Sequence, residues 1–182
     1  MTAQPDAGPP PDVDLIDAWR DGDEAAAAEL VHRHTGAVAR FLRSSGAQPD
    51  ELDDLVQEAF FRAFRRIDSW RGESGFRAWL LTIAGNLLRD LWRRRKGRLV
   101  LPLAEDDLAG ASTPDGEFEA DEAAERIRSE LVRLPRLQRE VFLLRVQEGV
   151  GYEEIARVLG TTVGAARVHY HHAVRRLKER VR

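Results

Sequence analysis

The stretch that decides the fold is Asp53–Arg98, DDLVQEAFFRAFRRIDSWRGESGFRAWLLTIAGNLLRDLWRRRKGR. It starts with acidic residues on an apolar-striped helical pattern and continues through a Gly-containing loop flanked by Trp70 and Trp79. A second helical pattern ends in a basic run that consists of Arg89, Arg93, Arg94, Arg95, Lys96 and Arg98. Acidic, aromatic and basic parts in this order indicate two different partners, one of which is nucleic acid.

The same helical spacing of apolar residues recurs through most of the chain and predicts an all-α fold. The first helix is expected to bury Val13, Ile16 and Trp19. Asp50 and Ser74 are expected as N-caps of the third and fourth helices. The predicted helices lie at about 12–21, 24–44, 50–67, 74–98, 120–134, 136–148, 152–159 and 163–180.

The charge pattern divides the chain into two small helical domains joined by an acidic flexible linker. From Leu99 to Glu125 there are nine acidic residues and no Lys or Arg, and like charges keep such a segment expanded. The net charge of −3 hides strongly basic segments, so the local charges still favour a polyanionic partner. We therefore expect a disordered tail at 1–11, a first domain at 12–98, the linker at 99–122 and a second domain at 123–182.

Several classes of protein are excluded or disfavoured by composition. The chain has no cysteine, which excludes disulfides and thiolate metal sites and fits a cytoplasmic protein. Its longest apolar runs are far short of the roughly 20 residues that cross a bilayer, so no membrane insertion is expected. No Gly-rich phosphate loop or Ser/His/Asp constellation is apparent, and we expect no enzyme, no cofactor and no bound metal. The last predicted helix ends near Arg182, and no further C-terminal domain is expected.

The C-terminal residues have the pattern of a helix-turn-helix. Ile155 and Leu159 are expected to face the core of the short helix YEEIARVL, and Gly160 permits the turn. The last helix shows a basic face formed by Arg167, His171, His172, Arg175 and Lys178. A helix presented in this way can enter the major groove of DNA. A helical hairpin used only for packing is the alternative.

Two segments of the chain resemble a known family. LPRLQREVFLLRVQEGVGYEEIARVLGTTVGAARVHYHHAVRRL is similar to region 4 of bacterial sigma factors of the extracytoplasmic-function (ECF) type, within the sigma-70 family. DLVQEAFFRAFRRIDSWRGESGFRAWLLTIAGNLLRDLWRRR is similar to their region 2. The two blocks occur in the family's order, separated by an acidic linker, and the resemblance spans about Asp12 to Arg180.

The resemblance implies that the DLVQE helix binds the clamp of core RNA polymerase. The matching residues are Asp54, Leu55, Gln57 and Glu58. From the residues alone, a solvated helix face is the preferred interpretation of the polar members, and the resemblance favours polymerase binding instead.

The resemblance also implies that the Trp70 loop and the following helix form a pocket for unstacked bases of the promoter's −10 element. The matching pocket positions are Arg66, Trp70, Ile83 and Asn86. An aromatic face stacks a splayed base, at roughly 1–3 kcal/mol per base, and an amide can read the edge of the base. Trp79 is interpreted mainly as a core residue.

The basic residues of both blocks are expected to contact promoter DNA. Arg89, Arg93, Arg94, Arg95 and Lys96 would contact phosphates near the melting site, although a helix end that complements its own dipole is the alternative. In the second block the expected −35 contacts are Arg167, His171, His172 and Arg175. The linker either passes through the polymerase cleft, as the resemblance implies, or is a plain solvated tether.

One part of the last helix departs from the family pattern. Gly164-Ala165-Ala166-Arg167-Val168 replaces the usual Gly-Thr-Val start and is expected to lose a Thr cap, and His169, His171 and His172 stand where Arg is frequent. Neutral imidazoles would weaken DNA binding. A metal site built from these histidines is disfavoured, because adjacent residues diverge around a helix.

These features together predict an ECF-type sigma factor. It would bind core RNA polymerase and direct promoter-specific initiation by recognising the −35 and −10 elements and promoting DNA melting. An anti-sigma factor is an expected further partner. A DNA-binding regulator that acts without core polymerase is the alternative, and an enzyme is disfavoured.

Overall fold

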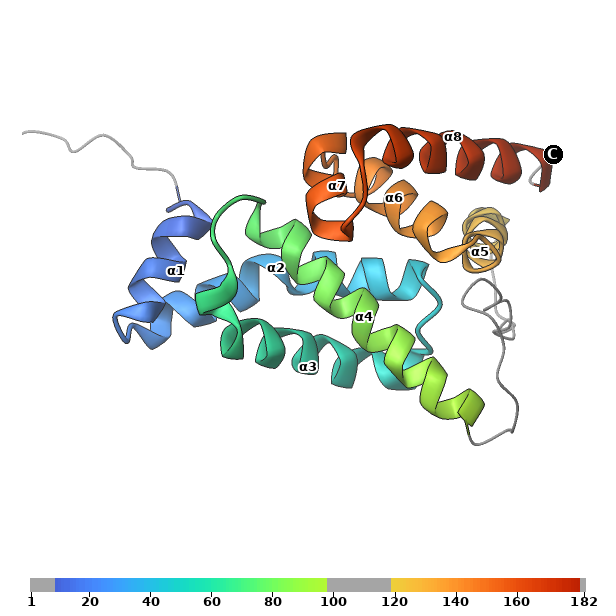
Figure 1. Cartoon of the computed structure of the whole chain (residues 1–182). Coiled ribbons are helices and arrows are strands. Elements are labelled where there is room, and N and C mark those ends of the chain that lie inside the picture. The colour runs from blue at the N-terminus through green and yellow to red at the C-terminus, as the bar shows by residue number, and fades with distance from the viewer. Residues whose placement is uncertain (1–8, 98–118, 181–182) are drawn as a thin grey trace, which may run out of the picture.

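The computed structural model describes residues 9–97 and 119–180, and every regular element in these two ranges is helical (Figure 1). The expected all-α fold is therefore confirmed. The elements in chain order are α1 (Asp12–Arg20), α2 (Glu24–Ser44), the 3-10 turn η1 (Pro49–Glu51), α3 (Leu52–Arg65), the 3-10 turn η2 (Ile67–Ser69), α4 (Phe76–Gly97), α5 (Glu119–Val132), α6 (Arg136–Val146), α7 (Tyr152–Leu159) and α8 (Val163–Arg180).

Helices α1–α4 form an N-terminal bundle, in which α3 packs along α4 and α2 packs against the other three. Its core consists of the inward stripes that the spacing predicted, with Phe41, Leu42 and Leu80 fully buried. The prediction that Val13 is buried was wrong. Val13 is 49% exposed, and Leu15 fills the inward position beside Ile16, because α1 has only nine residues and its stripe fits two rotations almost equally well.

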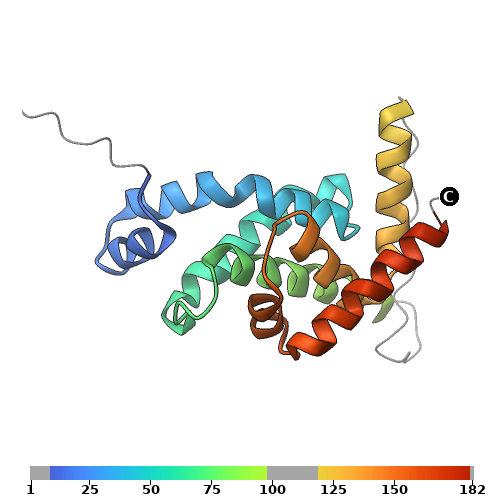
Figure 2. The same ribbon diagram turned by 90° about the horizontal axis from the view of Figure 1, so that it is seen from above.

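Helices α5–α8 form a C-terminal bundle, in which α8 packs across α6 and α7. Figure 2 shows α5 and α8 at the side of this bundle that lies away from α1. The core holds Leu144, Ile155 and Ala173. Gly160 ends α7 at φ +65°, a left-handed conformation that favours glycine, and so redirects the chain into α8.

The two bundles touch, and their buried side chains form one contiguous core. Helix α7 packs on α4, and α5 approaches the end of α2 (Figures 1 and 2). At Gly46 a Cβ atom would lie 2.9 Å from Cγ2 of Val132 and 3.3 Å from Cζ2 of Trp92. Glycine therefore permits the close approach of α2, α4 and α5 at this point.

Residues 1–8 of the predicted tail and 99–118 of the predicted linker lie outside the described residues, as does Arg98 of the basic run. Helix α5 begins at Glu119. The last four residues assigned to the linker, 119–122, are therefore helical.

Both predicted N-caps are replaced by other groups. The backbone N–H of Gln48 donates to Oε2 of Glu51 at 3.1 Å, so the turn before α3 is closed by Glu51 instead of Asp50. Helix α4 starts at Phe76, two residues after Ser74. The N–H of Gly75 donates to Oε1 of Glu154 on α7, at 2.5 Å. The start of α4 is thus capped by a carboxylate from the other bundle.

Candidate nucleic-acid interface

The outward face of α3 carries the residues that the sequence assigned to polymerase binding. Asp54 and Gln57 are exposed, and Glu58 is partly exposed with its Oε1 accepting from Nε of Arg62 at 2.7 Å. Leu55 is buried and supports this face from the core. The polar side chains therefore project together from a helix whose opposite side is fixed by packing.

Phe61 lies on the same outward face and was missed by the sequence reasoning. It is 56% exposed, and the guanidinium carbon of Arg65 lies 5.5 Å from its ring centroid. Its position four residues after Gln57 could have revealed it, because residues at this spacing share a helix face. A large exposed aromatic among polar residues is typical of a protein-binding surface.

The Trp70 loop differs from the expected open aromatic face. Trp70 is only 6% exposed; its Nε1 donates to the carbonyl oxygen of Ser74 at 3.1 Å, and its ring packs edge-on against Phe76 with centroids 6.1 Å apart. Arg20 on α1 also fixes the loop, since its Nη2 donates to the carbonyl oxygens of Ile67 and Trp70 at 3.0 and 3.2 Å. The ring of Trp70 is a core group in this structure, because the loop folds back over it.

The other three expected pocket residues divide between surface and core. Arg66 and Asn86 are exposed, whereas Ile83 is buried. Trp79 is half-buried and packs against Phe76 with centroids 5.9 Å apart, as its interpretation as a core residue requires. Arg66 and Asn86 are therefore accessible at the surface, whereas the two apolar members of the set, Trp70 and Ile83, belong to the core.

The basic end of α4 is less uniform than its sequence suggests. Arg93 and Arg94 are exposed, and Nε of Arg94 donates to the carbonyl oxygen of Asp90 at 3.3 Å. Arg95 forms an ion pair with Glu51. The side chain of Lys96 lies outside the described residues.

Arg89, the first residue of the basic run, is partly buried and lies near Arg136 of the C-terminal bundle. Burial lowers the pKa of Arg89, and the neighbouring charges of Arg136 and Arg93 lower that pKa further. Arg89 is therefore placed among charged groups of α6 in this arrangement and not at the open surface.

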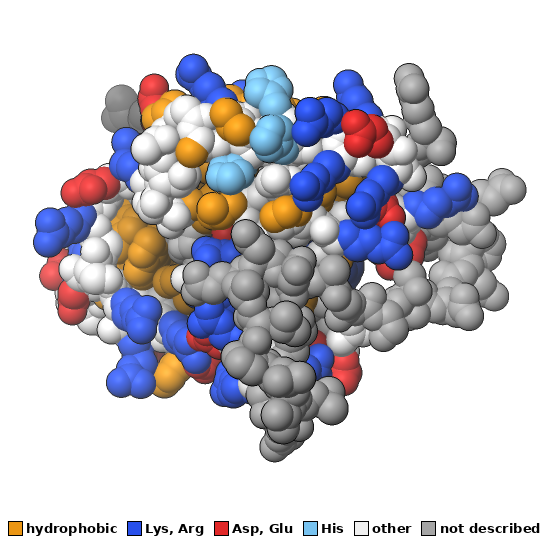
Figure 3. Space-filling view, turned by 45° about the vertical axis from the view of Figure 1, so that its right-hand side comes forward, with side chains coloured by type: hydrophobic (Ala, Val, Ile, Leu, Met, Phe, Trp, Pro, Cys, Tyr) orange, Lys and Arg blue, Asp and Glu red, His pale blue; other side chains and the backbone are white. Residues whose placement is uncertain are grey.

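The C-terminal bundle contains the predicted helix-turn-helix, formed by α7, the Gly160 turn and α8. Arg167, His171 and Arg175 on α8 are exposed, whereas His172 is half-buried. At the top of Figure 3, histidine side chains and Lys or Arg side chains gather over α8. This face is basic only in part, because imidazoles separate the guanidinium groups.

The expected loss of the cap at the start of α8 was wrong. Oγ1 of Thr162 accepts from the N–H of Ala165 at 3.1 Å. Thr162 therefore caps the helix even though Gly164 and Ala165 occupy its first positions.

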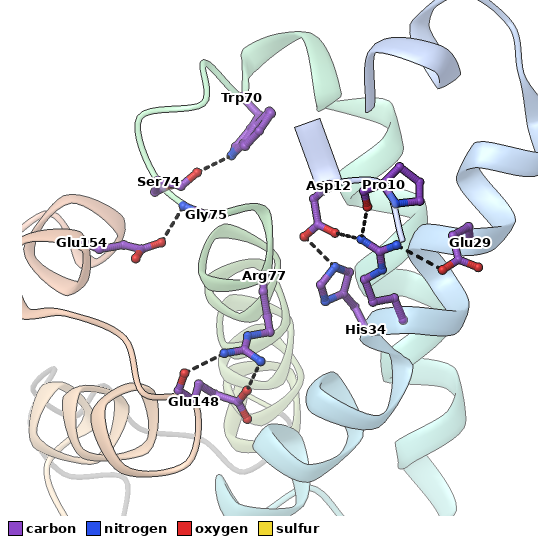
Figure 4. A network of polar contacts seen from close by, with 11 residues as sticks. Pro10, Asp12, Glu29, His34, Trp70, Ser74, Gly75, Arg77, Glu148 and Glu154 are labelled. Atoms are coloured by element: carbon purple, nitrogen blue, oxygen red, sulfur yellow. Dashed lines mark hydrogen bonds and ion pairs between the residues drawn. The ribbon is translucent and has the colours of Figure 1, made fainter. Parts of the chain in front are cut away.

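Charged contacts between the bundles form a network that the sequence reasoning missed (Figure 4). Arg77 on α4 donates from Nη2 to the carbonyl oxygen of Glu148 at 2.6 Å, and its Nη1 lies 3.4 Å from Oε2 of the same residue. Nη2 of Arg40 on α2 lies 3.8 Å from Oε1 of Glu148. Together with the bond from Gly75 to Glu154, these contacts join the loop after α6 and the helix α7 to the start of α4.

Two family models match successive parts of this chain. The family model for Sigma-70 region 2 matches residues 30–98, and that for Sigma-70 region 4 matches residues 124–177. The RNA polymerase sigma factor CnrH of Cupriavidus metallidurans is 36% identical over 86% of this chain and 87% of its own length. The chain belongs to the ECF sigma factors of the sigma-70 family. The ECF sigma factor SigF of Caulobacter vibrioides is 35% identical to this sigma factor over 89% of each chain.

Solved structures of related sigma factors share the fold. The structure of CnrH in complex with the cytosolic domain of CnrY superposes with a TM-score of 0.70 at 32% identity, over 92% of this sigma factor and 95% of that chain. The sigma factor RpoE of Bartonella quintana, in complex with the anti-sigma factor NepR, gives a TM-score of 0.64 at 25% identity, over 84% and 94% of the two chains. This sigma factor directs promoter-specific initiation of transcription by RNA polymerase. Among the helices in 9–97 and 119–180, none is long and apolar enough to cross a membrane.

Proposed function

We propose that this sigma factor binds core RNA polymerase through the outward face of α3. The observation that carries this proposal is the combination of Asp54, Gln57 and Glu58 with the exposed ring of Phe61 on one rigid helix. Polar groups fix the register of such an interface, and a central aromatic side chain supplies apolar area. Leu55 is buried and would contribute to polymerase binding only by holding α3 against the core.

The surface beside the Trp70 loop is the proposed reader of the −10 element. Arg66 and Asn86 are exposed and have the chemistry to contact a phosphate and the edge of an extruded base. Trp70 and Ile83 shape the floor, and the ring of Trp70 becomes available for stacking only when residues 71–75 move away from it. We propose that this movement accompanies promoter opening.

Two basic surfaces are proposed to hold duplex DNA on either side of the melted segment. At the end of α4 these are Arg93, Arg94 and Lys96, joined by Arg95 and Arg89 once the present neighbours of these two arginines are exchanged for phosphates. On α8 they are Arg167, His171, His172 and Arg175, which we assign to the −35 element. Guanidinium groups supply the phosphate attraction there, and imidazoles supply hydrogen bonds to the groove.

We also propose the domain organisation, the partners and the absence of catalysis. Residues 12–98 would form the unit that binds polymerase and the −10 element, and 123–182 the unit that binds the −35 element, with 99–122 linking them. The polymerase performs the chemistry, so the sigma factor acts without catalysis, in the cytoplasm where the polymerase and DNA are. An anti-sigma factor is a proposed partner because related chains were solved with CnrY and with the anti-sigma factor NepR.

The test compares changes on the outward face of α3 with a change at an exposed residue elsewhere on the N-terminal bundle. Asp54→Ala combined with Gln57→Ala should weaken binding to core polymerase by at least about tenfold, as measured by fluorescence anisotropy of the labelled chain. Asp14→Ala is the control, because Asp14 is an exposed carboxylate on α1 and lies outside this face. Equal effects of the two changes would remove this face from the interface.

Run-off transcription of fragmented genomic DNA, sequenced with and without the protein, tests initiation directly. New transcripts starting downstream of a shared sequence element are expected only when both core polymerase and this chain are present. A protein that footprints duplex DNA but never associates with core polymerase would be a regulator of another kind, and the proposal would fail.

A further inference from the structure

Two carboxylates of the C-terminal bundle meet the first turn of α4. Glu148, in the loop after α6, lies between Arg40 and Arg77. Glu154 on α7 accepts from the N–H of Gly75, and Figure 4 shows this contact beside that of Arg77 with Glu148. Backbone N–H groups at the start of a helix and a pair of guanidinium groups are both sites that bind anions. The start of α4 therefore has two adjacent anion positions, and both are occupied by groups from the same chain.

The N-terminal bundle forms a basic recess beside these positions. A cavity of about 480 Å³ is lined by Asp12, His32, Arg33, His34, Gly36, Ala37, Arg40 and Arg77. Arg33 is already neutralised there, since it forms ion pairs with Asp12 at 2.8 Å and with Glu29 at 3.2 Å. The charge left to balance at the edge of the recess is that of Arg40 and Arg77, and Glu148 supplies the opposite charge.

Glu148 fits this position poorly. Its side chain is only 1% exposed, and neither carboxylate oxygen accepts a hydrogen bond. The separations of 3.4 and 3.8 Å from the two guanidinium groups exceed the roughly 2.7–2.9 Å of a charge-assisted hydrogen bond. A buried carboxylate held at such distances recovers little of its desolvation cost. An anion with better geometry would therefore displace it.

The position of the site relative to the Trp70 loop indicates which anion this is. Ser74 accepts from the indole of Trp70, Gly75 follows it, and Arg77 is two residues further along. A strand whose base is handled by this loop would bring its next phosphates to the start of α4. A backbone phosphodiester carries one negative charge, as a carboxylate does, but its two free oxygens suit both a helix N-terminus and a guanidinium pair, and the charge is repeated along the strand.

We propose that Arg40, Arg77 and the N–H of Gly75 form a phosphate-binding site for the single strand of the opened promoter, and that Glu148 and Glu154 occupy this site when the two bundles are packed together. The assignment of the strand rests on the proposed function. The site is masked by the chain itself, so the C-terminal bundle must leave the start of α4 before the strand can bind.

The test measures binding of a fluorescein-labelled oligothymidylate to the full chain by fluorescence anisotropy, in the absence of polymerase. Glu148→Gln keeps the side-chain shape and should tighten binding by about tenfold, because one competing charge is lost. Glu153→Gln is the matched control, since Glu153 is exposed on α7 and its change alters the net charge equally. Arg77→Ala should abolish the gain from Glu148→Gln and reduce the slope of log affinity against log salt by about 0.7. Arg43→Ala, an exposed change on α2, should do neither.

Three results would overturn the proposal. The first is an equal gain from Glu148→Gln and Glu153→Gln, which would be a general charge effect. The second is a gain that survives Arg77→Ala. The third is a gain seen with an oligoglutamate peptide but not with the oligonucleotide, which would assign the site to an acidic protein. Glu154→Ala tests the site from the other carboxylate if Glu148→Gln fails to fold by circular dichroism. Because polymerase is absent, failure here is distinct from failure to bind core enzyme.

Discussion

Truncation of the Trp70 side chain should lower the free energy of unfolding of the N-terminal bundle, whether or not the ring also binds a promoter base. The ring is 6% exposed, packs edge-on against Phe76 and donates a hydrogen bond to the carbonyl oxygen of Ser74. Trp70→Ala removes all three contributions and leaves a cavity under the loop. Changes of a buried aromatic residue to alanine cost about 3–5 kcal/mol. Total stabilities are about 5–15 kcal/mol, so a large part of the folding free energy would be lost.

A conservative variant separates the ring from its hydrogen bond. Trp70→Phe keeps an aromatic ring in the cavity but cannot donate to Ser74, so it should cost about 1–2 kcal/mol from the lost bond and reduced volume. Arg71→Ala changes an exposed residue of the same loop and should stay within about 0.5 kcal/mol of the parent chain. The free energy of unfolding should therefore fall most in Trp70→Ala, less in Trp70→Phe and least in Arg71→Ala.

Urea unfolding followed by circular dichroism at the helical band is the appropriate assay, because Trp19, Trp79 and Trp92 would confuse a fluorescence signal. The reasoning is refuted if Trp70→Ala costs less than about 1 kcal/mol, since a buried and hydrogen-bonded indole cannot be removed so cheaply. A loss of promoter opening by Trp70→Phe at near-parental stability would show a separate, direct role of the indole in base capture. Permanganate reactivity of unpaired thymines measures that opening.

Three further predictions concern positions fixed by local geometry. Burial lowers the pKa of His34, although Asp12 at 2.8 Å opposes the shift. The unfolded chain therefore binds more protons than the folded chain, and the free energy of unfolding should fall as the pH decreases below about 6.5, by at most about 1.4 kcal/mol per pH unit. His34→Gln should remove this pH dependence in urea titrations. Gly160→Ala should cost about 1 kcal/mol or more because φ is +65°, whereas the helical Gly164→Ala, with open space around its Cβ, should be neutral or stabilising in thermal melts. Thr162→Ala should cost about 1 kcal/mol through the lost cap of α8, and an unchanged melting temperature would contradict that role.

The helices could be predicted because their information is local. Apolar spacing in α2 and α3 places Leu30, Val38 and Phe60 inward whatever the rest of the chain does, and the structure buries all three. The spacing is weaker evidence in short helices, which explains the wrong placement of Val13 in the nine-residue α1. For Trp70 the local pattern gave a loop aromatic, but its burial depends on Arg20 and Phe76, which lie elsewhere in the chain or on the next helix.

The contacts between the bundles could not be predicted in the same way. Glu148 and Glu154 stand in sequence as ordinary acids near helix ends, where solvated carboxylates are common. Their partners Arg77 and Gly75 lie 71 and 79 residues away in the chain. No periodicity connects such positions, and only the packing of α7 on α4 brings them together. Apart from Phe61, which its spacing on α3 could have revealed, the residues of the candidate site that sequence reasoning missed are those whose role depends on this packing.

The same packing changes how the charge of the chain should be interpreted. The sequence predicts a polyanion-binding surface from clusters of arginine, yet two arginines of the cluster on α4 face other charged groups of the chain, Arg95 with Glu51 and Arg89 with Arg136, and so does Arg77 at the start of the same helix, with Glu148. Two of these three sets of contacts bring together groups from different bundles, so separating the bundles would expose the guanidinium groups of Arg77 and Arg89 without any change in net charge. Affinity for DNA phosphates depends on how many cations can reach them, and not on the charge of the whole chain. A sigma factor built in this way would bind DNA weakly while its bundles are packed together and more strongly once another protein, such as the polymerase, holds them apart.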